Sequence, residues 1–284
     1  MGDLLKKAAS PETLNLAWKH LRNDKSVWTA TMPRREMEKD LIYHITLLAR
    51  ELESGNYKPE QVRIFPVMKG DGKKRIISAL TLKDKLAQRA VLTVLNPIGE
   101  AIFHNDSYGY RPGRSIDMVM KRVKENTDCG YFWLVDADIK SFFDEIPHGI
   151  LKKKLKKLIS DKELLKLIFQ WLDIGAPRTG VLAKRRGIPQ GGIISPFLCN
   201  FYLTQFDNYL SAGNLPFVRF ADDFLIFTPS KKHARSALAF AEKGLNKLDL
   251  KLNQRKTKIV PSSPRVIFLG RKLPGKKKKR KIAK

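Results

Sequence analysis

The chain has 284 residues, of which 43% are apolar, so it can bury a sizeable core and is not expected to be disordered. Its 55 Lys and Arg against 28 Asp and Glu give a formal net charge of +27, which indicates a polyanionic partner, either nucleic acid or an anionic membrane surface. Its two isolated cysteines and five scattered histidines exclude a zinc site. A membrane span is not predicted, because the sequence contains no stretch of about 20 apolar residues.

The first elements in chain order are helices followed by a hairpin. Residues 4–54 are predicted to be mostly helical, with a helix start at Ser10-Pro11, because Pro is favoured at the first helical position. Residues 62–79 alternate around the basic, glycine-rich turn 69–73, which predicts a β-hairpin. The helical spacing in the first segment is carried by Leu41, Ile45, Leu48 and Leu52.

The remainder of the chain mixes strands and helices. Strands separated by helices, with basic helical material inserted, indicate an α+β architecture. The predicted helices cover residues 82–103, 149–172 (one helix or a pair), 195–210 and 231–249. The predicted strands cover residues 131–139, 181–189, the hairpin 217–228, 257–260 and 265–269.

Two acidic clusters lie within apolar strands. Strand alternation places Asp136 and Asp138 on one face, and Asp222-Asp223 interrupts the apolar hairpin. Taken alone, Asp222-Asp223 is more simply interpreted as a turn, although no glycine accompanies it. Acids in such strands are costly unless they are paired or bind metal. Both clusters in one strongly basic chain therefore indicate a metal site that faces a polyanion.

Phosphoryl transfer is the chemistry that this pattern favours. In two-metal sites one cation activates the attacking 3′-hydroxyl and the other stabilises the leaving pyrophosphate. Mg²⁺ prefers a few carboxylates together with phosphate oxygens and water. Carboxylates from two adjacent strands, those of Asp138, Asp222 and Asp223, supply such a ligand set.

Six short segments form a recognisable series when they are taken in chain order. They are residues 107–115 (SYGYRPGRS), 138–144 (DIKSFFD), 190–196 (QGGIISP), 220–223 (FADD), 252–258 (LNQRKTK) and 268–270 (FLG). In this order they resemble the motifs of reverse transcriptases, most closely the bacterial type typified by group II introns. The resemblance spans about residues 60–270 and implies a right-hand polymerase fold with fingers and palm.

The resemblance assigns the metal site and the sugar-selecting residue. It implies that Asp138 and Asp222 are the principal ligands of two Mg²⁺ ions, which Mn²⁺ can replace, and that Asp223 completes the triad. Asp136 is left without a catalytic role. Phe143 corresponds to the bulky position below the sugar, where a ring clashes with a 2′-hydroxyl and favours dNTPs. Without the motif, Phe143 would be interpreted as an ordinary core aromatic.

Substrate and template contacts are implied in the same way. Lys69 and Arg75 flank the fingers turn and would hold the incoming triphosphate, although the alternative for this hairpin is a solvated basic turn. Gln190 and Gly191 would lie against the nascent base pair and the template.

Two further contacts complete the implied set. Lys256, or less favourably Lys258, would interact with the leaving pyrophosphate. Arg111 and Arg114 would position the template backbone.

The predicted domains are a helical N-terminal extension with fingers (1–130), a palm (131–270) with a helical insertion at about 149–186, and a basic tail (271–284). The tail holds nine Lys and Arg and no acid, so it is predicted to act as an electrostatic clamp on the duplex. No room is left for the family's helical thumb. We therefore expect the thumb to be missing and the tail to replace part of its contacts. The alternative is that the tail is a disordered end and that a noncoding RNA or protein partner supplies the thumb function.

The predicted function is that of an RNA-directed DNA polymerase, a nucleotidyltransferase that uses dNTPs, an RNA template and a DNA or RNA primer. One alternative is a nucleic-acid-binding or maturase-like protein of the same fold with little or no synthesis. Another is a palm polymerase that copies DNA or extends RNA. Retroelement subtypes such as retrons and antiviral defence-associated enzymes also stay open. A bacterial cytoplasmic location without membrane attachment is expected, since no signal peptide is recognised at residues 1–7.

Overall fold

In a computed structural model of the chain, residues 3–68, 74–175 and 185–275 are described. They form two compact units. Unit 1 comprises Met1–Ile102 and Phe143–Tyr202, and unit 2 comprises Phe103–Phe142 and Leu203–Lys284. Residues 103–130 thus group with the later strands, whereas the predicted boundary at residue 130 grouped them with the N-terminal helices. Helices α7 (Phe142–Glu145) and α10 (Ser195–Ala212) each run from one unit into the other.

Unit 1 is organised around the long helix α5 (Leu82–Glu100), against which three N-terminal helices pack. These are α1 (Asp3–Ala9), α2 (Pro11–Leu21) and α4 (Leu41–Ser54). The predicted start of α2 is confirmed, because the Ser10 hydroxyl accepts a hydrogen bond from the Thr13 amide at 3.2 Å. The predicted helical segment is not continuous, since residues 22–33 are irregular and only α3 (Arg34–Met37) and the 3₁₀ turn η1 (Glu38–Asp40) precede α4.

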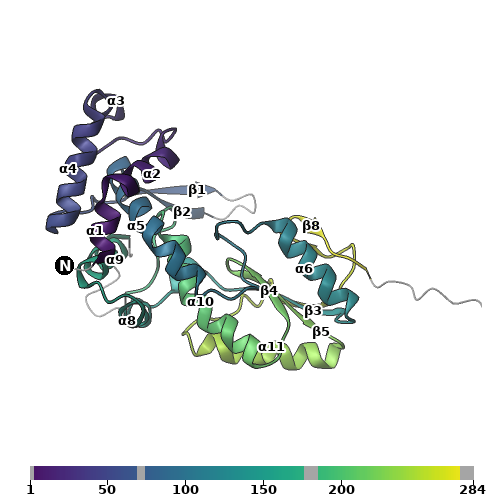
Figure 1. Cartoon of the computed structure of the whole chain (residues 1–284). Coiled ribbons are helices and arrows are strands. Elements are labelled where there is room, and N and C mark those ends of the chain that lie inside the picture. The colour runs from purple at the N-terminus through teal and green to yellow at the C-terminus, as the bar shows by residue number, and fades with distance from the viewer. Residues whose placement is uncertain (1–2, 69–73, 176–184, 276–284) are drawn as a thin grey trace, which may run out of the picture. The chain divides into compact units, whose positions relative to one another are not determined.

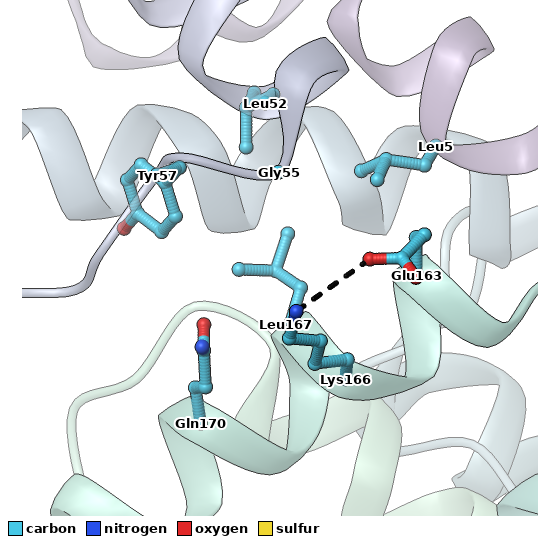
Figure 2. A pocket seen from close by; sticks show the side chains of 8 residues that line it. All are labelled: Leu5, Leu52, Gly55, Tyr57, Glu163, Lys166, Leu167 and Gln170. Carbon is cyan, nitrogen blue, oxygen red and sulfur yellow. Dashed lines mark ion pairs between the residues drawn. The ribbon is translucent and has the colours of Figure 1, made fainter. Parts of the chain in front are cut away.

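A buried carboxylate fixes the segment that follows α4. Asp84 of α5 accepts hydrogen bonds from the Tyr57 hydroxyl and from the Glu60 amide, the latter at 3.1 Å. Tyr57 also lines a small cavity of about 20 Å³ together with Leu52 and Leu167 (Figure 2). That volume accommodates about one water molecule, so the cavity is a packing feature of the helices and not a substrate pocket.

The β-hairpin predicted at residues 62–79 and the helices predicted at 149–172, within the proposed insertion, both form in unit 1. Strands β1 (Arg63–Met68) and β2 (Lys74–Ala79) pair antiparallel. The insertion is a pair of helices, α8 (His148–Leu158) and α9 (Lys162–Gly175). Residues 181–184 of the predicted strand at 181–189 lie outside the described residues, and residues 185–189 form one isolated bridge, between Pro147 and Arg186.

Unit 2 is built on a four-stranded antiparallel sheet in the order β4-β5-β3-β6. Helices α6 (Ile116–Asp128) and α11 (Lys231–Asn246) cover its opposite faces (Figure 1). The strands and α11 match the predicted elements, whereas α6 was not predicted. The strands are β3 (Trp133–Asp138), β4 (Phe217–Phe220), β5 (Asp223–Thr228) and β6 (Lys258–Pro261).

The face covered by α6 carries the acids. Leu134 of β3 and Leu225 of β5 are buried there in one cluster with Val119 and Val123 of α6. Because strand side chains alternate, Asp136 and Asp138 continue the face of Leu134, and Asp223 continues the face of Leu225. The predicted α+β architecture and the shared face of the two β3 acids are therefore confirmed.

The first residues of the predicted basic tail belong to the folded unit. Strand β8 (Arg271–Lys272) pairs with β7 (Ile267–Phe268), and Leu273 is buried in the α6 cluster. The Ser262 hydroxyl donates to the Pro274 carbonyl at 2.6 Å. Residues 276–284 lie outside the described residues. Within the described part of the chain, no helix is both long and apolar enough to cross a bilayer.

Candidate active site

The acidic triad meets where β3 ends and β5 begins. Asp138 is the last residue of β3 and pairs across the antiparallel ladder with Asp223, the first residue of β5. Asp222 lies in the turn before β5, and its carbonyl accepts a hydrogen bond from the Ile139 amide at 3.2 Å. Ala221, which precedes it, has a left-handed backbone with φ +59°. The Asp222-Asp223 pair is thus both a hairpin turn and part of an acidic cluster.

The three carboxylates share one electrostatic field. Burial raises the pKa of Asp223 to about 7, and the negative charges of Asp222 and Asp138 contribute to the rise. Lys256 acts in the opposite direction on the same carboxyl group. Burial is the larger cause of the raised pKa, and the part that comes from the neighbouring negative charges is one that a divalent cation would relieve.

The raised pKa of Asp223 predicts how stability depends on pH. A folded-state pKa of about 7 against an ordinary value of 3.8 means that the folded state binds this proton more tightly. The resulting stabilisation is present below about pH 4 and is lost as pH rises through about 7. In metal-free buffer, we therefore expect the difference in melting temperature between the wild type and Asp223→Asn to decrease as pH rises from about 4 to about 7. Scanning calorimetry measures the melting temperatures, and Asp117→Asn, a change at an exposed carboxylate, is the control. Parallel pH profiles of the wild type and Asp223→Asn would contradict the prediction.

Asp138 is held by two side chains from a single turn. It is buried, with 6% of its surface exposed. Its Oδ1 accepts from Asn253 Nδ2 at 3.0 Å, and its Oδ2 accepts from Lys256 Nζ at 2.7 Å. The Lys256 amide donates to the Asn253 carbonyl at 3.0 Å, so the turn presents both side chains to one carboxylate. Asn253 was missed as a site residue, although its spacing of three from Lys256 within the LNQRKTK segment was the available signal.

The chemistry of these donors suits Mg²⁺, because all three are carboxylates. Within residues 3–68, 74–175 and 185–275, however, no group of three or more His, Cys, Asp or Glu is already arranged to hold a metal ion. The Lys256 ammonium group instead stands beside Asp138 Oδ2, as a cation would. A cation that binds Asp138 through Oδ2 would compete with Lys256 for this oxygen.

Removing the Lys256 charge is expected to tighten metal binding. An ion pair with one exposed partner contributes ~1 kcal/mol or less, so Lys256→Gln should increase Mn²⁺ affinity up to about fivefold. Titration calorimetry with Mn²⁺ measures the change. Lys258→Gln is the matched control, because Lys258 Nζ lies 4.0 Å from Asp136 Oδ2 and not on the triad. Equal affinities of wild type and Lys256→Gln would show that the lysine does not compete with the cation.

Unit 1 brings Gln190 together with two other predicted elements. The Gln190 carbonyl accepts from the Ser78 amide of β2 at 2.7 Å, and Gln190 Nε2 donates to Asp144 Oδ1 at 3.0 Å. The Ile188 amide donates to the Phe143 carbonyl at 2.7 Å. Gly191 has φ +110°, a backbone conformation that favours glycine. The QGG segment is therefore fixed both to the fingers hairpin and to the segment that carries Phe143.

Three further predicted site residues, Phe143, Arg75 and Lys69, belong to unit 1 of the chain. Phe143 is half-buried, whereas its neighbour Phe142 is 2% exposed and is the core aromatic of this pair. Arg75 lies in β2 opposite Val67. Lys69 lies outside the described residues.

The two arginines of the SYGYRPGRS segment differ in their surroundings. Arg111 is 6% exposed, and its Nη1 donates to the carbonyls of His104 and Ser107, both at 2.6 Å. Arg111 thus supports its own loop from within. Arg114 is less buried, with its guanidinium 5.6 Å from the centre of the Tyr108 ring. Of the two, Arg114 is the more exposed.

Comparison with known proteins agrees with the order of the motifs. The family model described as reverse transcriptase (RNA-dependent DNA polymerase) matches residues 67–273. Protein YkfC of Escherichia coli (strain K12) is 31% identical over 313 residues, which cover 95% of this chain and 82% of that protein. The group II intron-encoded protein LtrA of Lactococcus lactis subsp. cremoris is 30% identical over 263 residues, which cover 89% of this chain. The chain spans only 43% of the length of LtrA.

A solved structure supports the fold alone. Telomerase from Candida albicans, in complex with a fragment of telomeric RNA, aligns with a TM-score of 0.56 and 15% identity. The alignment covers 86% of this chain and 50% of that one. The predicted fold of fingers and palm is thereby confirmed.

Proposed function

Because the chain belongs to the reverse transcriptase (RNA-dependent DNA polymerase) family and is similar to its group II intron type, we propose that it copies RNA into DNA. In this proposal it extends the 3′-hydroxyl of a DNA or RNA primer with dNTPs. The observation that carries the proposal is the pairing of Asp138 with Asp223 beside the Asp222 turn. Burial and mutual repulsion of these carboxylates favour binding of a divalent cation.

The triad would hold two Mg²⁺ ions, with Asp138 and Asp222 as principal ligands and Asp223 completing the set. Bound there, the two cations would supply activation of the primer hydroxyl and stabilisation of the leaving pyrophosphate. Asn253 orients Asp138 through Oδ1. Lys256, once displaced from Oδ2, is close enough to the triad to meet the negative charge of the pyrophosphate.

The unit 1 residues would bind the substrate and template. Lys69 and Arg75 would hold the triphosphate, and Gln190 and Gly191 would lie against the nascent base pair. The hydrogen bond from Ser78 to Gln190 supports this role, because it ties the QGG segment to the hairpin that bears Arg75. Arg114 is proposed to contact the template backbone, and Arg111 to shape the loop that presents it.

Phe143→Ala is expected to admit ribonucleotides, because the half-buried ring is proposed to meet a 2′-hydroxyl. Discrimination between a deoxy and a ribo substrate should fall at least about tenfold, since the clash of one hydroxyl group with a ring corresponds to ~1.4 kcal/mol or more. Competing incorporation of dATP and ATP measures it. Phe142→Leu is the control, since it changes a buried ring in the same segment and should leave sugar choice unchanged. Unaltered discrimination in Phe143→Ala would make this residue part of the packing.

Primer extension on an RNA template, with Mg²⁺ and then Mn²⁺, tests the proposed function. Incorporation of dNTPs opposite the template supports it. Tight RNA binding without incorporation under both metals would favour the alternative of a maturase-like protein of the same fold. The net charge of +27 supports nucleic acid as the partner in either case.

The biological setting is proposed only in outline. A bacterial cytoplasmic location fits the resemblance to YkfC and LtrA. A noncoding RNA or a protein partner that adds contacts to the duplex would support long products, and the basic tail is proposed to assist there. Co-purification of RNA with the chain would identify such a template or partner.

A further inference from the structure

A buried arginine lies on the face of the sheet opposite Asp223. Arg219 of β4 pairs with Phe224, so its side chain projects away from the face of the neighbouring Asp223. Arg219 and Asp207 of α10 are 1% and 0% exposed, respectively. The Nε and Nη2 atoms of Arg219 donate to the two oxygens of Asp207 at 2.7 Å and 2.5 Å. Both members of this bidentate pair belong to unit 2 and are almost fully buried.

The remaining donors of Arg219 contact the acidic turn and the SYGYRPGRS loop. Its Nη1 donates to the Ala221 carbonyl at 2.9 Å, and its Nη2 donates to the Ser107 hydroxyl at 2.7 Å. One planar guanidinium thus joins α10, the loop and the residue that immediately precedes Asp222. A lysine ammonium group is a single point charge and does not reproduce this fork.

The loop also contacts β4, the strand that leads into the turn, through its backbone. The Arg219 amide donates to the Asp106 carbonyl and the Tyr108 amide donates to the Arg219 carbonyl, both at 2.8 Å. Gly109 follows directly, and a Cβ atom there would lie 2.5 Å from the Ala221 amide nitrogen. The loop therefore packs against the turn without room for a side chain.

The turn needs such support because of its conformation. Ala221 has φ +59°, and residues with a Cβ adopt this left-handed region only at a cost. A fixed hydrogen bond to the Ala221 carbonyl opposes relaxation of the turn. The carboxylate of Asp222 leaves the backbone one residue later, so its position follows that of this peptide.

We propose that Arg219 is a positioning residue for the active site. Held by Asp207 and Ser107, it fixes the Ala221 carbonyl and thereby sets where Asp222 presents its carboxylate. This inference rests on the proposed polymerase function and deepens it. A merely structural role is distinguishable, because a buried ion pair replaced as a whole by apolar residues often leaves stability unchanged or increased.

The double variant Arg219→Met/Asp207→Leu separates the two roles. It removes both charges together, so it is expected to melt within a few degrees of the wild type, yet it leaves the Ala221 carbonyl without its donor. Single-nucleotide incorporation on a primed RNA template should show kcat lowered about 10- to 100-fold, since ångström-scale misplacement of a reacting group costs that much. The KM for dNTP should stay within about twofold, because the groups proposed to bind the nucleotide are intact.

A matched control and a conservative variant complete the experiment. Arg122→Met removes a guanidinium that binds Asp106 of the same loop at 2.8 Å, and it should leave kcat unchanged. A folded double variant with wild-type kcat overturns the positioning role. If the double variant does not fold, Arg219→Lys decides: a lowered kcat at an unchanged melting temperature supports the inference, and a wild-type kcat overturns it. A wild type that incorporates no nucleotide rejects the proposed function itself, which is a separate outcome.

Discussion

Replacing Asp222 with Asn is expected to lower single-nucleotide incorporation by at least about a thousandfold, and Asp138→Asn by a similar factor. In the proposed mechanism both cations would depend on carboxylates from both strands, and metal stabilisation of the transition state is worth several kcal/mol, or ~4 kcal/mol for a thousandfold change. The amide keeps the shape of the side chain but not its charge. Primer extension with Mg²⁺ and with Mn²⁺ measures the loss.

The control for this prediction is Asp136→Asn, because Asp136 lies on the same strand face but outside the triad, opposite Lys258. Its activity should stay within about fivefold of the wild type. RNA affinity, measured by fluorescence anisotropy, should change little in all three variants, since the loss of one carboxylate does not weaken a strongly basic surface. Incorporation near the wild-type rate in Asp222→Asn would remove the triad from the mechanism.

Gly109→Ala is expected to damage both folding and synthesis. The added Cβ would lie 2.5 Å from the Ala221 nitrogen and 3.1 Å from the Phe220 carbonyl carbon, and neither backbone atom can move aside as a flexible side chain does. Overpacking of this kind costs about 1–3 kcal/mol of unfolding free energy. Movement of the turn away from Gly109 would shift Asp222, so incorporation should also fall about 100-fold.

Chemical denaturation and single-nucleotide incorporation measure these two effects. Gly149→Ala is the control, because nothing lies within 4 Å of the added Cβ and the site is in helix α8, where Ala is favoured over Gly. Wild-type stability together with wild-type incorporation in Gly109→Ala would show that close packing of the loop against the turn is needed neither for folding nor for synthesis.

The elements that the sequence predicts well are those with a strong local pattern. Alternation placed Asp136 and Asp138 on one strand face, and the register of β3 with β5 then sets Asp138 opposite Asp223. The start of α2 was predictable because Ser10 and Pro11 each have a defined role at a helix N-terminus. Helix α6 was missed because its buried stripe is short, with Val119 and Val123 as its fully buried apolar residues.

The site was harder to predict where long-range partners decide a side chain's role. Arginine in a basic chain suggests a nucleic-acid contact, yet Arg111 turns inward to two carbonyls of its own loop. Arg219 lies in an apolar strand, and no neighbouring residue in the sequence indicates that it pairs with Asp207. Asn253 reaches Asp138 across a sequence separation of 115 residues. Such pairings depend on the tertiary fold, so no periodicity in the sequence reveals them.

The ammonium group of Lys256 beside Asp138 has a consequence for how the protein matures. A carboxylate cluster that lacks any counter-charge resists compaction, and many metal sites solve this by making folding dependent on the ion. Here a counter-ion is part of the chain itself, because Lys256 Nζ lies 2.7 Å from Asp138 Oδ2. We therefore expect unit 2 to reach its native state even where a divalent cation is scarce. In the proposed mechanism the ion is needed for turnover, so chelation is expected to stop synthesis without unfolding the protein.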